Sequence, residues 1–409
     1  MSATPANCHV FQDGEDWLVF APASRLVLRT NRSKAAEFER CIDQTESPGV
    51  GMLSAEREFT WSDVDRILIA CGNRCRLRCR YCLSSDGGPV ITPDAEFCRS
   101  ALKEILGGTE KTGVLVGFLA MGEPTIPWER FTDCVSAVQE VGNELGHPLG
   151  MSITTDGQLE RSERSWLCDR MQRIDVSLDG PAAVQNLQRP RKDGGESYHR
   201  PAELIAEALA AGVEVRIRTT VTGETVQQMP QFVDFFADAF GERIRVMFAA
   251  MMELEAAPGG FNSPEPDLFA RNFGAALDRG RARGVHVGHC VVSIETLVLD
   301  AGREVNRTVC LLPNRTVARH YEPFWLGDAR NFSSSVFARF EHPLGCLVVD
   351  ERKHQESFHG VLPPRCHTCA CVAACAGYPS SWGWNEVHPG DHECEVRRGV
   401  MREILRRAV

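Results

Sequence analysis

The chain has 409 residues and a formal net charge of −10 at pH 7, and hydrophobic residues make up 43% of it. That length fits two or three domains with a large buried core, and the acidic balance argues against nucleic acid as a partner. No run of about 18 apolar residues occurs, and residues 1–5 lack the basic segment of a signal peptide. We therefore expect no membrane segment and a cytoplasmic location.

Residues 1–62 predict a small N-terminal α+β unit. Short strands are expected at His9–Gln12, Trp17–Phe20 and Arg25–Arg29, because each is a short apolar or alternating run and an Asp–Gly turn separates the first two. Ser33 is expected to cap a helix that runs from Lys34 to about Gln44.

Strands and helices alternate between residues 63 and 295, which we take as the second unit. The expected strands are 66–70, 113–120, 148–154, 172–178, 213–220, 243–249 and 285–292. The expected helices between them are 93–107, 128–145, 161–169, 200–211, 228–240 and 266–283. Apolar strands that alternate with helices predict a parallel sheet with right-handed crossovers.

A loop rich in cysteine and arginine follows the first of these strands. Cys75, Cys79 and Cys82 have the spacing C-x3-C-x2-C, which brings three thiolates together on one loop. Thiolates are the soft ligands that bind iron–sulfur clusters and zinc, and three ligands leave one iron of a four-iron cluster open. A structural zinc site is the alternative, although such sites usually contain two separated cysteine pairs.

This loop, with Tyr81 as the aromatic residue before Cys82, resembles the cysteine motif of the radical SAM superfamily. The resemblance implies a [4Fe-4S] cluster on Cys75, Cys79 and Cys82, with S-adenosyl-L-methionine on the open iron and Tyr81 beside it. It implies that one electron cleaves this cofactor to a 5′-deoxyadenosyl radical, which abstracts hydrogen from the substrate. It also implies an α/β fold, a partial (β/α)6 TIM-like barrel whose ligands collect at the carboxyl ends of the strands.

Two further motifs follow the second and third strands of the expected barrel. Gly122-Glu123-Pro124 resembles the family's G-G-E-P element, which implies contacts with the amino group of the cofactor. Thr155 lies in Thr154-Thr155-Asp156-Gly157, which resembles a T-N-G element with Asp156 in place of asparagine. An ordinary strand-to-helix turn is the alternative for this second motif.

The fourth strand ends in the sequence Ser177-Leu178-Asp179-Gly180-Pro181, and Arg189 follows. The pattern resembles the S-x-D-G-P…R element of the subfamily with cysteine-rich extensions. It implies that Ser177 and Arg189 bind the carboxylate of the cofactor, with Arg191 as a second choice. Val221, at the end of the fifth strand, is the expected contact for the adenine.

Residues 296–409 lose the alternating rhythm and form the third expected unit. Four cysteines have a spacing that resembles the SPASM/twitch domain, which implies that they bind an auxiliary [4Fe-4S] cluster: Cys366, Cys369, Cys375 and Cys394. A zinc ribbon is the alternative. Pro379 stands where the family has a further cysteine, so we expect one auxiliary cluster only. The amphipathic, basic residues 395–409 predict a docking helix.

The resemblance implies an enzyme that modifies a ribosomally synthesised peptide by cross-link, thioether formation, epimerisation or oxidation. It implies a precursor peptide as substrate and a flavodoxin or ferredoxin as electron donor, and the N-terminal unit resembles a leader-peptide-binding element. Anaerobic sulfatase maturation and small-molecule radical SAM dehydrogenation stay open as alternatives. A non-catalytic iron–sulfur or zinc-binding interaction module is the non-enzyme alternative, but it would leave Glu123, Ser177 and Arg189 without a purpose.

Overall fold

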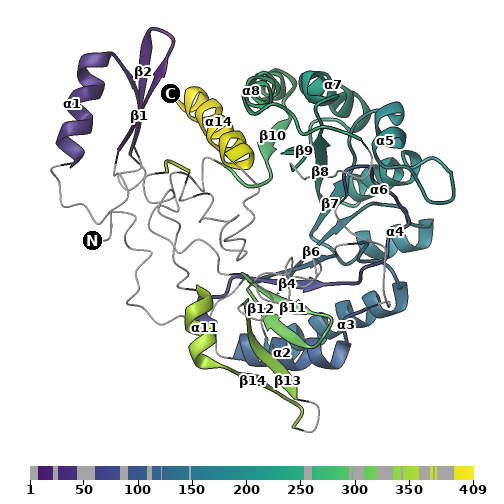
Figure 1. Ribbon diagram of the computed structural model, residues 1–409. Coiled ribbons are helices and arrows are strands. Elements are labelled where there is room, and N and C mark those ends of the chain that lie inside the picture. The colour runs from purple at the N-terminus through teal and green to yellow at the C-terminus, as the bar shows by residue number, and fades with distance from the viewer. Residues whose placement is uncertain are drawn as a thin grey trace.

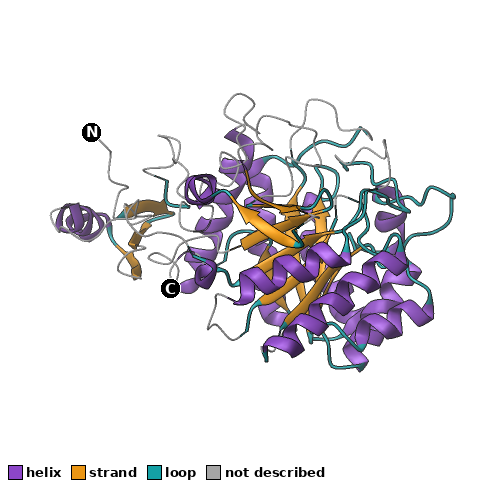
Figure 2. Cartoon of the chain, turned by 90° about the horizontal axis from the view of Figure 1, so that it is seen from below, coloured by secondary structure: helices purple, strands orange, loops and turns teal. Residues whose placement is uncertain are grey.

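The computed structural model describes residues 8–21, 26–43, 60–82, 91–107, 113–120, 122–146, 149–252, 260–293, 297, 308–319, 335–341, 344–358, 369–371, 374 and 391–409. It contains a small antiparallel sheet near the N-terminus and a large mixed sheet with helices on its outer face (Figures 1 and 2). No helix within these residues is long and apolar enough to cross a membrane.

The small sheet confirms the three strands predicted near the N-terminus. Its antiparallel strands are β1 (His9–Asp13), β2 (Asp16–Ala21) and β3 (Leu26–Thr30), in the order β1-β2-β3. Gly14 forms the turn between β1 and β2 with a φ of 63°, which glycine adopts without strain.

The helix predicted after this sheet is α1 (Arg32–Asp43), but its cap differs from the prediction. The side-chain oxygen of Asn31 accepts a hydrogen bond of 3.0 Å from the backbone N–H of Lys34. Asn31 therefore occupies the capping position, and the prediction that Ser33 caps the helix is wrong. Both residue types are good caps, so the local sequence did not distinguish them.

Parallel strands in the order β10-β9-β8-β7-β6-β5-β4-β11 make up most of the large sheet. Those that match the predicted strands are β4 (Arg66–Ala70), β5 (Leu115–Leu119), β6 (Gly150–Thr155), β7 (Arg173–Ser177), β8 (Glu214–Val221), β9 (Ile244–Ala250) and β10 (His286–His289). The matching helices are α2 (Ala95–Gly107), α3 (Trp128–Leu145), α4 (Arg161–Cys168), α6 (His199–Ala210), α7 (Met229–Phe240) and α8 (Pro266–Arg283). The α/β partial barrel is therefore confirmed.

One helix of the barrel, α5 (Ala182–Gln188), was not predicted. It follows β7 directly, after Gly180 and Pro181, and leads into the segment that contains Arg189. The helix has 7 residues, which is too short for a clear 3.6-residue pattern of apolar side chains.

The large sheet continues beyond residue 295, where the third unit was expected to begin. Strand β11 (Thr308–Leu312) pairs in parallel with β4, on the side of β4 opposite to β5. Three antiparallel strands complete the sheet: β12 (Thr316–Ala318), β13 (Val336–Glu341) and β14 (Cys346–Val349). The helix α11 (Glu351–Phe358) follows. The domain boundaries themselves stay a prediction.

Strand β4 is buried on both faces, as its unbroken apolar sequence predicts for a parallel strand. Ile67 and Ile69 pack into the main core that α2 and α3 cover. Leu68 and Ala70 pack on the opposite face, in a second cluster that includes Cys310 of β11. This burial fixes the strand that leads into the cysteine loop.

The predicted C-terminal docking helix is α14 (Asp391–Ala408), which begins four residues before the expected start. It packs along α8, where the two helices approach closely enough that a Cβ on Gly399 would lie 2.7 Å from the Cβ of Ala270. It also reaches the small sheet, since Arg406 pairs with Asp13 at 2.7 Å. The helix thus joins the N-terminal sheet to the barrel (Figure 1).

Candidate functional site

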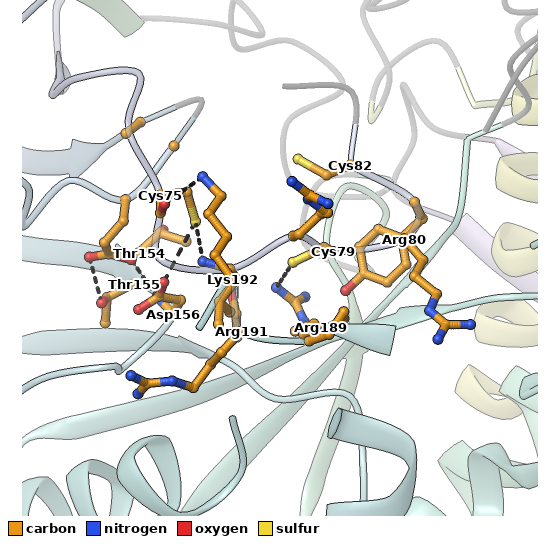
Figure 3. Close-up of a pocket in the computed structure, with 18 residues that line it drawn as sticks. Cys75, Cys79, Arg80, Cys82, Thr154, Thr155, Asp156, Arg189, Arg191 and Lys192 are labelled. Carbon is orange, nitrogen blue, oxygen red and sulfur yellow. Dashed lines mark hydrogen bonds between the residues drawn. The ribbon is translucent and has the colours of Figure 1, made fainter. Parts of the chain in front are cut away.

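A cavity of about 900 Å³ lies at the carboxyl ends of strands β4 to β7 (Figure 3). It is lined by Cys75, Leu77, Arg78, Cys79, Arg80, Tyr81, Cys82, Ala120, Gly122, Glu123, Thr154, Thr155, Asp156, Ser177, Arg189, Pro190, Arg191 and Lys192. Ligands of parallel α/β sheets bind at this edge of the sheet. The three cysteines of the loop therefore face the same space as residues from the ends of three further strands.

The cysteine loop is held in place by the segment that follows α5. Residues 76–80 and 188–192 run antiparallel, and Leu77 and Arg191 form a β-bridge. The backbone hydrogen bonds are Arg78 N–H to Pro190 O at 2.8 Å, Arg80 N–H to Gln188 O at 2.9 Å and Lys192 N–H to Arg76 O at 3.0 Å. This pairing fixes the backbone of the loop through its second cysteine.

The thiols of Cys75 and Cys79 have different neighbours. The Cys75 Sγ lies 3.7 Å from a carboxylate oxygen of Asp156, and the Cys79 Sγ lies 4.0 Å from Nη1 of Arg189 (Figure 3). Burial raises the pKa of the Cys75 thiol, and the charge of Asp156 adds to this shift. Burial also raises the pKa of the Cys79 thiol to about 12, although Arg189 opposes the shift.

The thiols of Cys75 and Cys79 are therefore protonated at neutral pH in the metal-free chain. Among the residues with described positions, no three His, Cys, Asp or Glu side chains already surround a common point as metal ligands. A metal that binds here must displace the thiol protons, so binding and the final arrangement of the loop are coupled. Three thiols on one loop in one cavity still form a donor set that suits an iron–sulfur cluster.

Gly122 lets the loop after β5 lie directly against the cysteine loop. A Cβ at this position would lie 2.2 Å from the carbonyl oxygen of Arg74. The same close contact allows the backbone N–H of Glu123 to donate a hydrogen bond to this carbonyl oxygen at 2.7 Å. The glycine is thus required by the close approach of two backbones.

The Glu123 carboxylate is buried beneath the cavity and accepts several hydrogen bonds. Its Oε1 accepts from the hydroxyls of Thr125 and Thr155, both at 2.8 Å, and its Oε2 accepts from the N–H of Asp156 at 2.6 Å. Burial, together with the charge of Asp156, raises the pKa of Glu123 to about 8. The hydrogen bonds from Thr125, Thr155 and Asp156 fix the orientation of the carboxyl group before any ligand binds.

A second buried carboxylate, Asp179, holds Arg189 and Tyr81 in position. Asp179 Oδ2 lies 2.9 Å from Nε of Arg189, and Oδ1 accepts from Nη2 at 3.1 Å. The Tyr81 hydroxyl donates to Asp179 at 2.5 Å. Asp179 therefore engages the edge of the guanidinium formed by Nε and Nη2, and Nη1 is the group directed towards Cys79.

The structure brings most of the predicted cofactor contacts together. Gly122, Glu123, Thr155, Ser177, Arg189 and Tyr81 all line the cavity with the three cysteines. Pro124 and Val221 are buried, and neither is among the lining residues. Contacts of these side chains with a cofactor stay predictions.

Sequence reasoning did not assign a role to Asp179 or Lys192, and it treated Arg78 and Arg80 only as part of the arginine-rich loop. Asp179 lies inside the S-x-D-G-P motif, so its position was noted, but its pairing with Arg189 depends on how α5 turns the chain. The two arginines alternate with the loop cysteines, which is a signal in the sequence itself. Lys192 is placed by the pairing of residues 188–192 with the loop.

The predicted auxiliary site is only partly within the described residues. Cys369 and Cys394 are both half-buried, and Cys394 lies in the first turn of α14. Cys366 and Cys375 lie outside the described residues. The auxiliary site therefore stays a prediction.

The fold and the site define an α/β partial-barrel protein with a three-cysteine loop at the carboxyl ends of its strands. Residues 69–236 match the Radical SAM superfamily, and they contain the cysteine loop and the motifs after β5, β6 and β7. The match places residues 69–236 in this superfamily, and the family implies S-adenosyl-L-methionine and a [4Fe-4S] cluster as cofactors of that region.

Two curated proteins share part of the sequence. The chain is 28% identical over 193 residues to the GTP 3′,8-cyclase of Limosilactobacillus fermentum, which covers 46% of this chain and 55% of that protein. It is 25% identical over 214 residues to the molybdenum cofactor biosynthesis protein moc-5 of Caenorhabditis elegans, which covers 52% of this chain and 32% of that protein. The matched region thus spans less than two thirds of either relative.

Solved structures share the fold over most of the chain. Histidine-tagged anSMEcpe with bound AdoMet aligns with a TM-score of 0.63 at 16% identity, over 84% of this chain and 97% of that chain. SuiB of Streptococcus suis bound to S-adenosylmethionine aligns with a TM-score of 0.55 at 13% identity, over 95% and 98% of the two chains. At these identities the similarity shows a common fold.

Proposed function

We propose that this enzyme modifies a ribosomally synthesised peptide at a C–H position. The observation that carries the proposal is the cavity in which three thiols of one loop face Glu123 and Arg189. Cys75, Cys79 and Cys82 would hold the [4Fe-4S] cluster. When bound, the cluster supplies the electron that cleaves S-adenosyl-L-methionine to a 5′-deoxyadenosyl radical, which abstracts hydrogen from the substrate.

The residues around the thiols would orient the cofactor. Glu123 is held by Thr125, Thr155 and the backbone of Asp156, so its carboxylate oxygens stay fixed as acceptors for an amino group. Arg189 keeps Nη1 towards the cavity while Asp179 engages its other edge, which leaves a charged donor for a carboxylate. Ser177 lines the same space.

Two features support a peptide as substrate. The fold is shared with SuiB, which has been solved bound to the precursor peptide SuiA, and with anSMEcpe, which has been solved with AdoMet and the Cp18Cys peptide. The N-terminal sheet adds a second unit beside the barrel, joined to it by α14. We propose this sheet as a leader-peptide-binding element, and a flavodoxin or ferredoxin as the electron donor.

The same site suits other radical SAM reactions. Maturation of a sulfatase would give an aldehyde on a protein side chain, and a small-molecule dehydrogenase would take no peptide. The sequence similarity to a GTP 3′,8-cyclase favours testing a nucleotide as the second candidate.

The first experiment measures cofactor cleavage by the anaerobically reconstituted chain. Reduction with dithionite in the presence of S-adenosyl-L-methionine is expected to release 5′-deoxyadenosine, measured by liquid chromatography and mass spectrometry. Cys79→Ala is expected to abolish this product. Cys168→Ala, which removes a half-buried thiol on α4 outside the cavity, is the matched control and should keep it. Normal cleavage by Cys79→Ala would contradict the site assignment.

The second experiment tests the peptide as substrate. The chain is co-expressed with short open reading frames that neighbour its gene, and each peptide is analysed by tandem mass spectrometry. A cross-link or oxidation removes hydrogen, and an epimerisation in D₂O introduces deuterium. An aldehyde that reacts with a hydrazide would favour sulfatase-type maturation, and turnover of GTP without peptide modification would refute the peptide proposal.

The auxiliary cluster is proposed on Cys366, Cys369, Cys375 and Cys394. With two [4Fe-4S] clusters we expect about eight irons per chain. Iron and sulfide analysis of the reconstituted protein checks this number. About four irons per chain would remove the auxiliary cluster and leave the first site intact.

A further inference from the structure

Five positively charged side chains line the cavity of an otherwise acidic protein with a net charge of −10. They are Arg78, Arg80, Arg189, Arg191 and Lys192. The carboxylates that line the cavity, Glu123 and Asp156, are buried beneath it and are occupied by hydrogen bonds within the protein. The charge at the mouth is therefore set by the cations.

Three of these cations already have partners. Arg189 is engaged by the carboxylate of Asp179. Arg191 donates from Nε to Asp193 at 2.9 Å. Lys192 donates from Nζ to the carbonyl oxygen of Cys75 at 2.8 Å, which ties it to the cysteine loop.

Arg78 and Arg80, which we call the arginine rim, differ from the other three. Both side chains are exposed. Within the described part of the chain, neither side chain forms an ion pair or a side-chain hydrogen bond, and the guanidinium of Arg80 lies 5.8 Å from the centre of the Phe261 ring. Figure 3 shows Arg80 directed away from the thiols, on the side of the loop opposite to Lys192.

The backbone places the two rim arginines at a spacing that suits an extended peptide. Residues 76–80 pair with residues 188–192 in a ladder-like pattern, in which the N–H groups of Arg78 and Arg80 donate to carbonyls two residues apart. Positions i and i+2 of an extended chain are about 7 Å apart and project to the same side. A second extended chain repeats its side chains at the same interval.

The cofactors implied by the class do not neutralise this rim. A [4Fe-4S] core bound by three thiolates has about one net negative charge in its resting state. S-adenosyl-L-methionine would add no net negative charge, because its sulfonium charge offsets its carboxylate. The two rim arginines therefore exceed the net charge of the cofactors, and both of their side chains are exposed.

We infer that the arginine rim binds acidic side chains of the substrate peptide, with carboxylates at alternate positions of an extended segment. This rests on the proposed function, and it names the class of peptide: one with Asp or Glu beside the residue that is modified. An extended peptide is favoured over a compact phosphate group because both arginines are exposed and their backbone N–H groups donate to carbonyls two residues apart, in a ladder that ends where Arg80 enters a turn.

The test uses the full, anaerobically reconstituted chain with S-adenosyl-L-methionine. The probes are a fluorescein-labelled peptide of alternating Glu and Gly and the isosteric peptide of alternating Gln and Gly, with affinity measured by fluorescence anisotropy. We expect the Glu peptide to bind about tenfold more tightly at low salt. The difference should shrink as ionic strength approaches 0.1 M, where the screening length is about 10 Å.

Substitutions then assign the preference to the rim. Arg78→Gln combined with Arg80→Gln should reduce the difference between the peptides to less than about twofold. Arg78→Glu combined with Arg80→Glu should reverse it, so that a peptide of alternating Lys and Gly binds best. The control is Arg130→Gln, which changes an exposed arginine of α3 outside the cavity and should leave the preference unchanged.

Several results would overturn the inference. Equal binding of the Glu and Gln peptides by the wild-type chain would refute it. A preference for the Glu peptide that persisted in the doubly substituted variant would refute it as well. Competition by GTP but not by the Glu peptide would assign the rim to a nucleotide phosphate. If the double variant lost binding of reduced flavodoxin and the wild type showed no preference between the peptides, the rim would be assigned to the electron donor. Release of 5′-deoxyadenosine is measured in the same samples. Cofactor cleavage without a preference for the Glu peptide would refute the role of the arginine rim and leave the proposed function intact. A preference for the Glu peptide without cofactor cleavage would refute the proposed function and leave the role of the rim intact.

Discussion

Replacement of Gly122 by alanine tests the packing on which the site depends. The added Cβ would lie 2.2 Å from the carbonyl oxygen of Arg74, 2.6 Å from its carbonyl carbon and 2.8 Å from its nitrogen. All three are backbone atoms, so no side-chain rotation can relieve the contact. Either the cysteine loop or the loop after β5 must move.

The expected loss in the free energy of unfolding follows from this displacement of the loops. Overpacking in a well-packed interior costs about 1–3 kcal/mol. Movement of the loop also weakens the 2.7 Å hydrogen bond from the N–H of Glu123 to the carbonyl of Arg74, which contributes about 1 kcal/mol. We therefore expect Gly122→Ala to lower the free energy of unfolding by about 2–4 kcal/mol. Because the loop carries the cysteines, we expect iron uptake to fall as well.

The assays are chemical denaturation of the metal-free protein and iron content after anaerobic reconstitution. Gly107→Ala is the matched control, because a Cβ at the end of α2 meets nothing within 4 Å. That variant should unfold and bind iron as the wild type does. If Gly122→Ala behaved like Gly107→Ala in both assays, the close contact between the two loops would be refuted.

Two further predictions concern buried charges. Asp179→Asn removes the charge partner of buried Arg189, so we expect the free energy of unfolding to fall by about 3–5 kcal/mol. We also expect the midpoint potential of the cluster, measured by EPR-monitored titration, to shift. The control is Asp278→Asn, which removes the exposed partner of Arg407 and should leave the potential unchanged. Burial lowers the pKa of His289 from 6.5 to about 3, so its stability contribution is present above pH 6.5 and is lost as pH falls towards 3. We expect about 2 kcal/mol to be lost between pH 6.5 and 5. His289→Asn, which can still accept the N–H groups of Val291 and Val292, should flatten this slope in denaturation curves at the two pH values; an unchanged slope would contradict the assignment.

The strands of the barrel could be predicted because the local sequence of each strand indicates that it is buried. The apolar run Arg66–Ala70 is the clearest case, since both faces of β4 are covered and four of its five residues are buried. Strand β11 was missed because its place depends on a partner far away in the chain: Thr308–Leu312 pairs with β4, and no local pattern indicates that pairing.

The site could be predicted where a residue's role depends on spacing, and not where it depends on tertiary contacts. The three cysteines were found because their ligand pattern lies within one loop. The engagement of Arg189 by Asp179 could not be predicted, because it requires α5 to return the chain beside the cysteine loop. The carboxylate of Asp156 near Cys75 is similar, since the loops after β4 and β6 meet only in the folded barrel.

The charges of the cavity form two layers with different consequences. In the inner layer, Arg189 is balanced by Asp179, and Glu123 is enclosed by hydroxyl and amide donors, so ionic strength should have little effect on this part of the site. In the outer layer, Arg78 and Arg80 are exposed, so their attraction for an anionic group is screened by salt. Salt should therefore raise the KM for an acidic peptide while it leaves slow cofactor cleavage without peptide unchanged. Cofactor cleavage that fell with salt in parallel with peptide turnover would place the rim charges in the inner layer and contradict this division.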